Sequence, residues 1–584
     1  MLKNWLKKFP ALFSLFTLIA ILYDLGFDQT EVLQEVLYGV YLAGLFIGII
    51  STVSRYFTSK TLKVKRLIWF DLLSIFFFLI IIFNDLSLFK SWEFLSYFTH
   101  VNWKYGALIL VFIREVSALQ INFSRTLFNP AQFFVLSFFI IIAIGTLLLS
   151  LPNATVGGIS FMDAAFTSTS AVCVTGLIVV DTGTYFTIFG KVIILVLIQI
   201  GGIGIMTFAS YFSYFFSGGS SYENQLVLSD MTSSNKLGEV FGTLKKIIIV
   251  TFTLEAIGAF LIFFTLENKE IYSYLDKGFF SIFHSISAFC NAGFSTLGDS
   301  LHEGGFRFNY GLQSIILLLF IIGGLGFPIV FNLFNYVTYL FKNRLIPIVL
   351  GKERKQIITP WVINLNSRIV LITTGILLLL GSSIFFAFEY HNSLAEHTFF
   401  GKILTSIFSA ATPRTAGFHT VDYSGLNFST IMLIFLLMWI GASPASTGGG
   451  IKTSTFAIAT LNFWSLARGK ERMELFRREV ADISIRRAFA IISLSLVAIG
   501  VGVFAIAYFD NDKQLIDIGF ECFSAYSTVG LSLGITEQLS NPSKFVLIAL
   551  MFTGRVSMLS LLIAITQKEK RKHYRYSQEE ILIN

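Results

Sequence analysis

The chain has 584 residues, of which 54% are hydrophobic and 13% are charged, and its formal net charge is +8. Soluble domains carry about 25% charged residues, so this composition excludes a typical soluble enzyme, a disordered chain and a disulfide scaffold. The three cysteines, Cys173, Cys290 and Cys522, lack zinc-site spacing and are expected to be small buried residues. We expect an all-α integral membrane protein whose positive charge lies in cytoplasmic loops and does not serve nucleic-acid binding.

Four apolar segments open the chain, at about 10–26, 34–54, 67–89 and 101–118. A membrane-spanning helix needs about 20 mostly apolar residues. The fourth segment contains Arg114 and Glu115, which leaves open whether it crosses fully. Lysines at the N-terminus and a basic loop at 55–66 favour a cytoplasmic N-terminus. Residues 1–128 are therefore predicted to form a helical extension of about four spans.

The remaining apolar segments come in four pairs: 131–151 with 186–215, 245–266 with 311–340, 366–388 with 429–465, and 488–508 with 543–566. Basic residues follow the second members, and a shorter semi-polar segment separates the members of each pair. The semi-polar segments are therefore expected to face outside and the tail at 568–584 to face the cytoplasm. We expect four tandem units, at 129–232, 233–345, 346–475 and 476–567.

The semi-polar segments share a motif that ends on a glycine and an apolar residue. The four copies are Ser-Ala-Val-Cys-Val-Thr-Gly176-Leu, Ser-Ala-Phe-Cys-Asn-Ala-Gly293-Phe, Ala-Thr-Pro-Arg-Thr-Ala-Gly417-Phe and Ser-Ala-Tyr-Ser-Thr-Val-Gly530-Leu. A second set of glycines follows 24 to 30 residues later, in the middle of the second predicted spans: Gly201, Gly323, Gly441 and Gly554. Two glycine registers at one period indicate a fourfold internal repeat.

A short helix precedes each motif glycine, at 161–171, 278–289, 400–411 and 515–526. About 11 residues rise roughly 16 Å, half of a hydrocarbon core of about 30 Å. Such segments are re-entrant, and four of them can direct carbonyl oxygens at one axis, as in a potassium filter. The alternative is four glycine turns that only permit tight helix packing. The predicted ion-binding residues are Val174, Thr175, Gly176, Asn291, Ala292, Gly293, Thr415, Ala416, Gly417, Thr528, Val529 and Gly530.

The segment 429–465 is too long for one span and contains ten residues, 441–450, that cannot hold a regular helix. We expect this break on the cytoplasmic side of the filter, where it could plug the pathway; a passive kink is the alternative. Arg555, near the centre of 543–566, would be an electrostatic barrier, a partner for the carbonyls of the break, or half of a structural ion pair. The predicted gate comprises Gly441, Ser443, Ser446, Thr447, Gly448, Gly449, Gly450, Lys452 and Arg555.

Several other polar residues lie near the predicted pore loops. Arg414 is expected to brace the third loop, with Asp422 as its partner, and His284 and His419 are expected to be packing or capping groups. Asp163 is expected to cap the first short helix, with a role in an acidic vestibule as the alternative.

Together these residues resemble the Trk/Ktr/HKT superfamily of K⁺ transporters, and most closely its bacterial membrane subunits of the TrkH/KtrB type. The resemblance rests on the motifs at Gly176 and Gly417, the glycine-rich break with Lys452, and Gly554-Arg555, and it covers about 131–566. It implies a channel-like pore of pseudo-fourfold symmetry, with K⁺ as the transported ion and no covalently bound cofactor. In this family a glycine at the Gly176 position implies K⁺ preference.

The resemblance also implies a homodimer in the cell membrane and a separate cytosolic ring of TrkA/KtrA-type nucleotide-binding subunits. The four N-terminal spans depart from the family's usual none or two. A Na⁺ or Na⁺-coupled cation transporter of the same fold is the alternative, and a broken-helix secondary transporter a weaker one. No paired acids, histidine cluster or activated nucleophile indicates an enzyme, because Asp71, Glu255 and Glu521 are isolated.

Overall fold

The structure is a computed structural model that describes residues 2–58, 65–85, 100–118, 130–204, 240–266, 273–341, 363–470 and 472–565. Parts of the predicted segments 67–89 and 186–215, the basic residues at 342–355 and the tail at 568–584 lie outside these residues. Within the described residues six helices are long and apolar enough to cross a membrane, and one bent pair could make a seventh.

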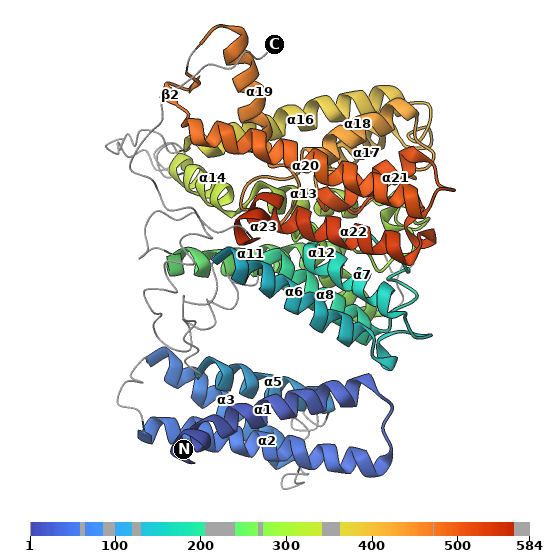
Figure 1. Cartoon of the computed structure of the whole chain (residues 1–584). Helices are drawn as coiled ribbons and strands as arrows, with labels where there is room; N and C mark the ends of the chain where they lie inside the picture. Colours follow the sequence, from blue (N-terminus) through green and yellow to red (C-terminus); the bar gives the residue numbers. More distant parts are fainter. Residues whose placement is uncertain are drawn as a thin grey trace, which may run out of the picture.

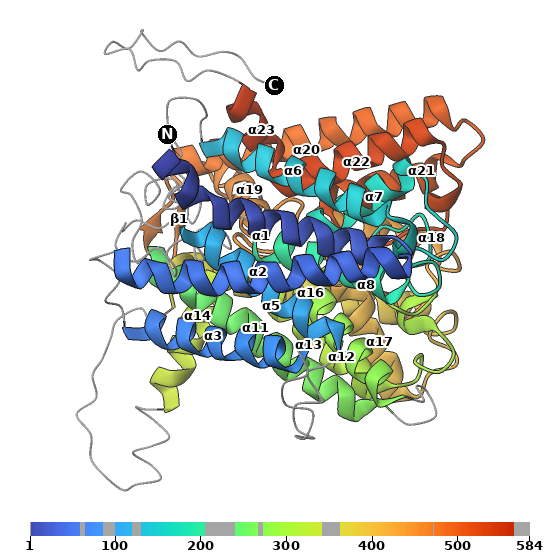
Figure 2. The same cartoon turned by 90° about the horizontal axis from the view of Figure 1, so that it is seen from below.

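In its described residues, the N-terminal extension forms a layer of four helices on one side of the molecule (Figures 1 and 2). They are α1 (Leu2–Gly26), α2 (Glu31–Thr58), α3 (Lys65–Asp85) and α5 (Val101–Ala118). Their shared core includes Tyr41 and Leu45. Arg114 donates to Asp71 at 2.8 Å in the interior of this layer, and Glu115 pairs with Arg55. A charge in an apolar interior needs such a partner, which explains how a segment with charged residues forms a packed helix.

The rest of the chain repeats one order of elements: a long helix, a short helix, a loop and a further helix. The first two copies are α6 (Pro130–Leu149), α7 (Phe161–Cys173) and α8 (Ile188–Ile203), then α11 (Val240–Thr265), α12 (Tyr274–Phe289), α13 (Tyr310–Leu325) and α14 (Phe327–Leu340). The others are α16 (Leu365–Glu389), α17 (Phe399–Ala411), α18 (Phe428–Trp439) and α19 (Thr453–Ala467), then α20 (Asp482–Phe509), α21 (Leu515–Ser527), α22 (Asn541–Val556) and α23 (Met558–Ile565). Figure 1 shows these helices above the N-terminal layer.

Short elements complete the described structure. The 3₁₀ turns are η2 (Pro152–Ala154), η4 (Ser300–His302) and η6 (Thr536–Gln538). The strands β1 (Glu474–Leu475) and β2 (Arg478–Glu479) form an antiparallel hairpin between α19 and α20.

The predicted spans 311–340 and 543–566 are each broken into two helices, so neither is one continuous helix. The chain bends by 106° between α13 and α14 at Gly326, whose φ is 84°, and α22 ends at Ser557, whose φ is 72°. Positive φ is the usual backbone signal that ends a helix. Gly204, with φ 85°, ends α8 in the same way. The second-register glycines Gly201, Gly323 and Gly554 therefore lie in the last turn of their helices, and not at mid-span.

The short helices begin close to the predicted positions except α12, which has 16 residues. α12 is longer because it begins at the cap Ser273, before the predicted start at 278. The prediction for Asp163 was wrong. Ser160 is the cap of α7 and accepts from the backbone N–H of Asp163, and the Asp163 carboxylate pairs with Lys544 of α22 at 2.7 Å. This pair ties the start of α7 to the helix beside it.

Candidate functional site

Each of the four short helices ends in a loop with the same unusual backbone. The residue two before the motif glycine has positive φ: 58° at Val174, 60° at Asn291, 78° at Thr415 and 51° at Thr528. The motif glycines themselves have φ of 91°, 70°, 79° and 90°. Two left-handed residues in such close succession cost free energy for any residue with a side chain, which only the surrounding structure can offset. Glycine at the second position removes half of that cost.

The four loops meet in a closed ring. A methyl group placed on Gly176 would lie 2.4 Å from the Ala292 carbonyl oxygen, and one on Gly293 would lie 2.8 Å from the α-carbon of Gly417. One on Gly417 would lie 2.6 Å from the Val529 oxygen, and one on Gly530 would lie 2.2 Å from the Thr175 oxygen. The backbones therefore touch in the order first, second, third, fourth and back to the first, and no side chain fits between them.

A hydroxyl group at the C-terminal end of each short helix holds its loop in place. Ser170 and Ser524 accept from the backbone N–H groups of Gly176 and Gly530, at 3.1 and 3.2 Å. In the second loop Ser287 instead donates to the carbonyl of Phe294, at 2.7 Å. The third copy has Ala411 at the serine position. There the hydroxyl of the next residue, Thr412, donates to the carbonyl of Phe418. Each loop is thus fixed to its own helix by one buried hydroxyl.

The second-register glycines pack on the ends of the short helices. A methyl on Gly201, Gly323 or Gly554 would lie 2.1, 2.0 or 1.7 Å from the carbonyl oxygen of Val172, Phe289 or Tyr526. Each of those carbonyls lies four residues before its motif glycine. Gly441 differs, because its methyl would meet the oxygen of Gly449, 2.4 Å away. The helices α8, α13 and α22 are therefore in backbone contact with the last turn of a short helix. In the third copy, Gly441 instead contacts the break that follows α18.

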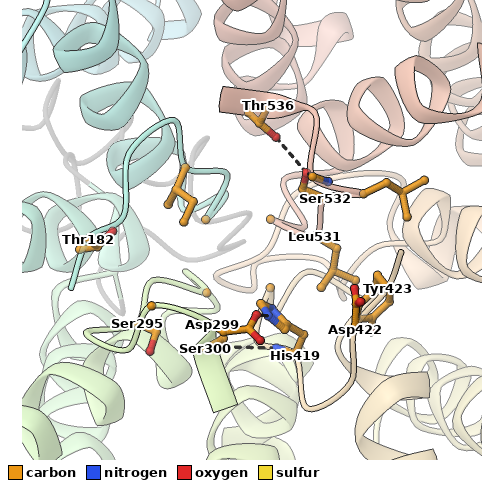
Figure 3. Close-up of a pocket in the computed structure, with 18 of the residues that line it drawn as sticks. Thr182, Ser295, Asp299, Ser300, His419, Asp422, Tyr423, Leu531, Ser532 and Thr536 are labelled. Atoms are coloured by element: carbon orange, nitrogen blue, oxygen red, sulfur yellow. Dashed lines mark hydrogen bonds and ion pairs between the residues drawn. The ribbon is translucent and has the colours of Figure 1, made fainter. Parts of the chain in front are cut away.

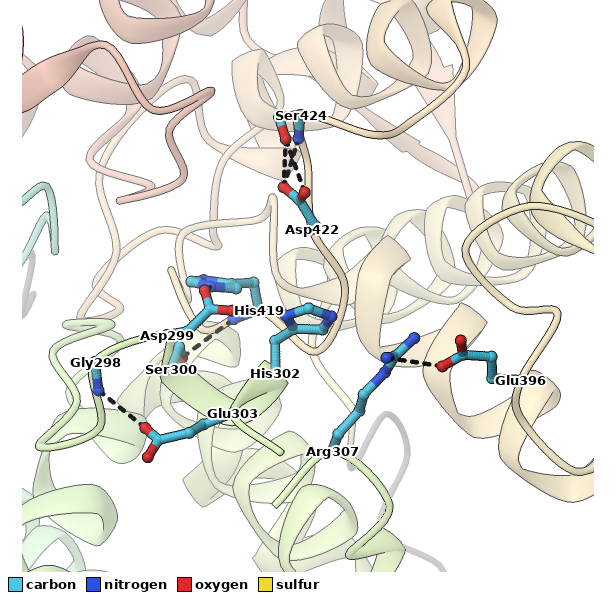
Figure 4. Close-up of polar contacts among 10 residues, drawn as sticks. All are labelled: Gly298, Asp299, Ser300, His302, Glu303, Arg307, Glu396, His419, Asp422 and Ser424. Carbon is cyan, nitrogen blue, oxygen red and sulfur yellow. Dashed lines mark hydrogen bonds and ion pairs between the residues drawn. The ribbon is translucent and has the colours of Figure 1, made fainter. Parts of the chain in front are cut away.

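A cavity of about 390 Å³ lies over the ring, with all four motif glycines in its lining (Figure 3). Its walls carry the carboxylates of Asp299, Asp422 and Glu537. Asp299 contacts His302 at 2.6 Å and His419 at 2.9 Å, in the cluster shown in Figure 4. The hydrogen bond to His419 lowers the pKa of Asp299 to about 2. The walls therefore place negative charge above the ring, which attracts cations.

The break between α18 and α19, the 440–452 loop, also lies against the ring. Thr447 donates from its hydroxyl to the Asn291 side chain at 2.9 Å, and the backbone N–H of Gly449 donates to the Thr528 hydroxyl at 2.9 Å. A methyl on Gly448 would lie 2.0 Å from the Thr415 hydroxyl. The 440–452 loop therefore touches three of the four left-handed residues of the ring.

Two cationic side chains hold this loop. Lys452 donates to the carbonyl of Gly448 at 2.5 Å. Within the loop, the Ser446 hydroxyl also donates to the carbonyl of Ser443. Arg555, the penultimate residue of α22, donates to the carbonyls of Thr447 and Gly201. The Arg555 guanidinium thus joins the loop to the end of α8 through two backbone carbonyls.

The structure overturns one predicted contact and agrees with two other predictions. Asp422 accepts from Ser424, and Arg414 donates to Thr374 of α16 at 3.3 Å, so the predicted Arg414–Asp422 pair was wrong. Arg414 still joins the third loop to a neighbouring helix. The three cysteines are buried and unoxidised, and His284 is buried with both ring nitrogens in hydrogen bonds.

Asp299, Ser532 and Glu521 were not singled out as site residues from the sequence. Asp299 and Ser532 line the cavity, and Glu521 is hydrogen-bonded to Ser532. Their one sequence signal is proximity to a motif glycine. In the part of the chain that the structure describes, no three His, Cys, Asp or Glu side chains form a metal-ligand cluster.

Comparison with known proteins places these features in a family. The family model for TrkH, described as a cation transport protein, matches residues 115–575. The Ktr system potassium uptake protein B of Bacillus subtilis is 34% identical over 456 residues, 78% of this chain and 96% of that protein. The potassium/sodium uptake protein NtpJ of Enterococcus hirae is 32% identical over 467 residues, 79% of this chain and 98% of that protein.

A solved structure has the same fold. The crystal structure of the potassium transporter TrkH from Vibrio parahaemolyticus superposes with a TM-score of 0.57 at 17% identity, covering 85% of this chain and 96% of that one. The sequence match begins inside α5 and ends beyond α23, so it is somewhat longer than the resemblance expected at 131–566. With its apolar helices and a family match over most of its length, the chain is a multi-pass membrane protein of the TrkH family of cation transport proteins.

Proposed function

We propose that this protein mediates K⁺ uptake across the cell membrane through the ring of four loops. The ring carries the proposal, because four left-handed turns that end in glycine bring the backbones of the four loops against one another in a closed order. Backbone oxygens can replace the hydration shell of K⁺. The short helices point their C-terminal ends at the ring, where the helix dipole favours a cation. Relatives that are 34% and 35% identical are named potassium uptake proteins.

The cation passes first through the cavity lined by Asp299, Asp422 and Glu537, and then through the ring. The filter comprises the twelve residues predicted above, in four tandem span–pore-helix–span repeats around one pseudo-fourfold axis. α1, α2, α3 and α5 are an N-terminal addition to these repeats. Both termini are cytoplasmic.

The 440–452 loop is the gate, in its closed position. Its contacts with Asn291, Thr415 and Thr528 put it against the ring, on the path by which an ion would leave. Arg555 holds the loop there by hydrogen bonds to the Thr447 and Gly201 carbonyls, and its charge opposes a cation below the filter. Opening requires the loop to exchange these bonds for others.

The names of several relatives, Ktr system proteins, favour a partner subunit. A cytosolic ring of TrkA/KtrA-type nucleotide-binding subunits controls the gate, and the chain forms a homodimer in the lipid bilayer. A second candidate is uptake of both K⁺ and Na⁺, favoured by the relative named a potassium/sodium uptake protein.

The test is rescue of a bacterium that lacks K⁺ uptake systems, grown at low K⁺, with the protein confirmed in the membrane and the Ktr-type partner coexpressed. Growth, together with Rb⁺ uptake that excess Na⁺ does not inhibit, is the expected result. Na⁺ inhibition at equal concentration favours the second candidate. Absence of both growth and uptake, with folded protein present, contradicts K⁺ uptake.

A further inference from the structure

Two of the four loops have an additional hydrogen bond to their own short helix. It joins the side chain nine residues before the motif glycine to the hydroxyl two residues after it. The pairs are Glu521 with Ser532 in the fourth copy and His284 with Ser295 in the second. The same two positions hold Thr167 and Ile178 in the first copy and Phe408 and His419 in the third. This contact therefore alternates around the ring.

The Glu521 carboxyl group is fully buried inside α21. Its oxygens accept from the hydroxyls of Ser532 and Thr536, the latter at 3.0 Å, and the backbone N–H of Leu533 also donates to it. Three donors satisfy a carboxylate that would otherwise be costly to bury. All three belong to the segment that leaves the ring after Gly530 and forms the cavity wall.

His284 makes the equivalent contact in α12, also at zero exposure. Its Nδ1 is 3.0 Å from the Phe280 carbonyl, which can only accept, so Nδ1 carries a proton. In the neutral ring Nε2 then accepts from the Ser295 hydroxyl, 2.9 Å away. The imidazole is stacked on the Phe280 ring, with 3.9 Å between centroids, which fixes its direction.

The other two copies lack this bond. The Thr167 hydroxyl is buried and has no partner in the structure, and the residue opposite it is apolar. In the third copy His419 contacts the neighbouring loop through Asp299. Since the ring order is first to fourth, the second and fourth copies face one another across the opening. Figure 3 shows Ser295 and Ser532 on opposite sides of the cavity.

We propose that Glu521 and His284 are positioning residues that hold two opposite loops of the ring and thereby set how well it discriminates K⁺ from Na⁺. The proposal rests on the proposed function. Ser295 and Ser532 are each two residues from a ring glycine, so a shift of either moves the oxygens that would contact the ion. Two facing walls held at fixed separation keep the opening from closing around a smaller cation.

The experiment replaces the two hydroxyls, because Ser295→Ala and Ser532→Ala remove the bond without leaving a large void. Loss of one hydrogen bond changes an equilibrium constant by about fivefold. Each variant is expected to raise the KM for K⁺ and to lower the K⁺-over-Na⁺ ratio of uptake about fivefold, with the maximal rate per folded protein within about twofold. Thr167→Val is the matched control, since it removes the partnerless hydroxyl at the equivalent position.

Unchanged KM and ion ratio in both serine variants would overturn the proposal, as would an equal effect of Thr167→Val. A second measurement separates this failure from failure of the proposed function. Purified wild-type protein is heated in K⁺, Na⁺ or choline chloride, and K⁺ is expected to give the highest unfolding temperature. No K⁺ effect in the wild type, together with no uptake, contradicts the proposed function itself. A K⁺ effect retained fully in both serine variants contradicts only the positioning role.

Discussion

The contact between Gly554 and the end of α21 makes a sharp prediction about stability. A methyl group at this position would lie 1.7 Å from the Tyr526 carbonyl oxygen, whereas real β-carbons stay at least 3.0 Å from other atoms. The two helices must therefore separate by at least about 1.3 Å, the difference between these distances. The obstacle is backbone and cannot rotate away. Overpacking costs about 1–3 kcal/mol, and we expect the upper end here.

Gly554→Ala is therefore expected to lower the folded-to-unfolded ratio by roughly 150-fold, which corresponds to about 3 kcal/mol. The displaced carbonyl is four residues before Gly530, so uptake should fall as well. The assay is denaturant unfolding of the purified protein in detergent, followed by Rb⁺ uptake in vesicles. Gly500→Ala in α20 and Gly375→Ala in α16 are the controls, because a methyl there meets no atom within 4 Å. These controls should be neutral or stabilising by up to about 1 kcal/mol. Equal stability of Gly554→Ala and the controls, with normal uptake, would refute the packing argument.

Three further predictions concern the ring, the loop and the cavity. Arg555→Ala removes the bonds to the Thr447 and Gly201 carbonyls, so Rb⁺ uptake per folded protein should rise severalfold; a fall would contradict the gate. Gly176→Ser adds a side chain at φ 91°, against the Ala292 oxygen, and should reduce K⁺-over-Na⁺ uptake, whereas Gly157→Ser, in open space, should not. Asp299 has a folded-state pKa of about 2, below its ordinary 3.8, so it stabilises the fold above about pH 4 and loses this effect as pH falls to about 2. The unfolding temperatures of wild type and Asp299→Asn should therefore differ at pH 5 and converge near pH 2; a constant difference would contradict the role of the carboxylate.

The local features that recur in the chain were predictable from it. Apolar length indicated membrane helices, and the two glycine registers located the four loops and three of the glycines that pack on the short helices. The irregular segment at 441–450 was predictable because proline and consecutive glycines do not sustain a helix. It lies in the structure between α18 and α19. All these features depend on residues close together in sequence.

Other features depended on neighbours far away in sequence. The break at Gly326 was missed because a single glycine in an apolar run is compatible with a continuous helix, and the 106° bend is stabilised by contacts with the 440–452 loop such as the Phe327 N–H to the Ala445 carbonyl. Arg414 was assigned the wrong partner for the same reason, since Thr374 is 40 residues away.

By itself, the sequence determined that the chain is a helical membrane protein with four similar loops, because apolar length and glycine spacing are local properties. Only the tertiary structure decided that the loops close into a ring in chain order, that Arg555 reaches both the break and the end of α8, and that Glu521 and His284 each bond the segment that leaves their own loop. Two isolated polar residues in apolar helices carry no sign of their partners. The partners appear when folding brings each helix against the segment that leaves its own loop, and a buried polar group must then find a hydrogen bond there.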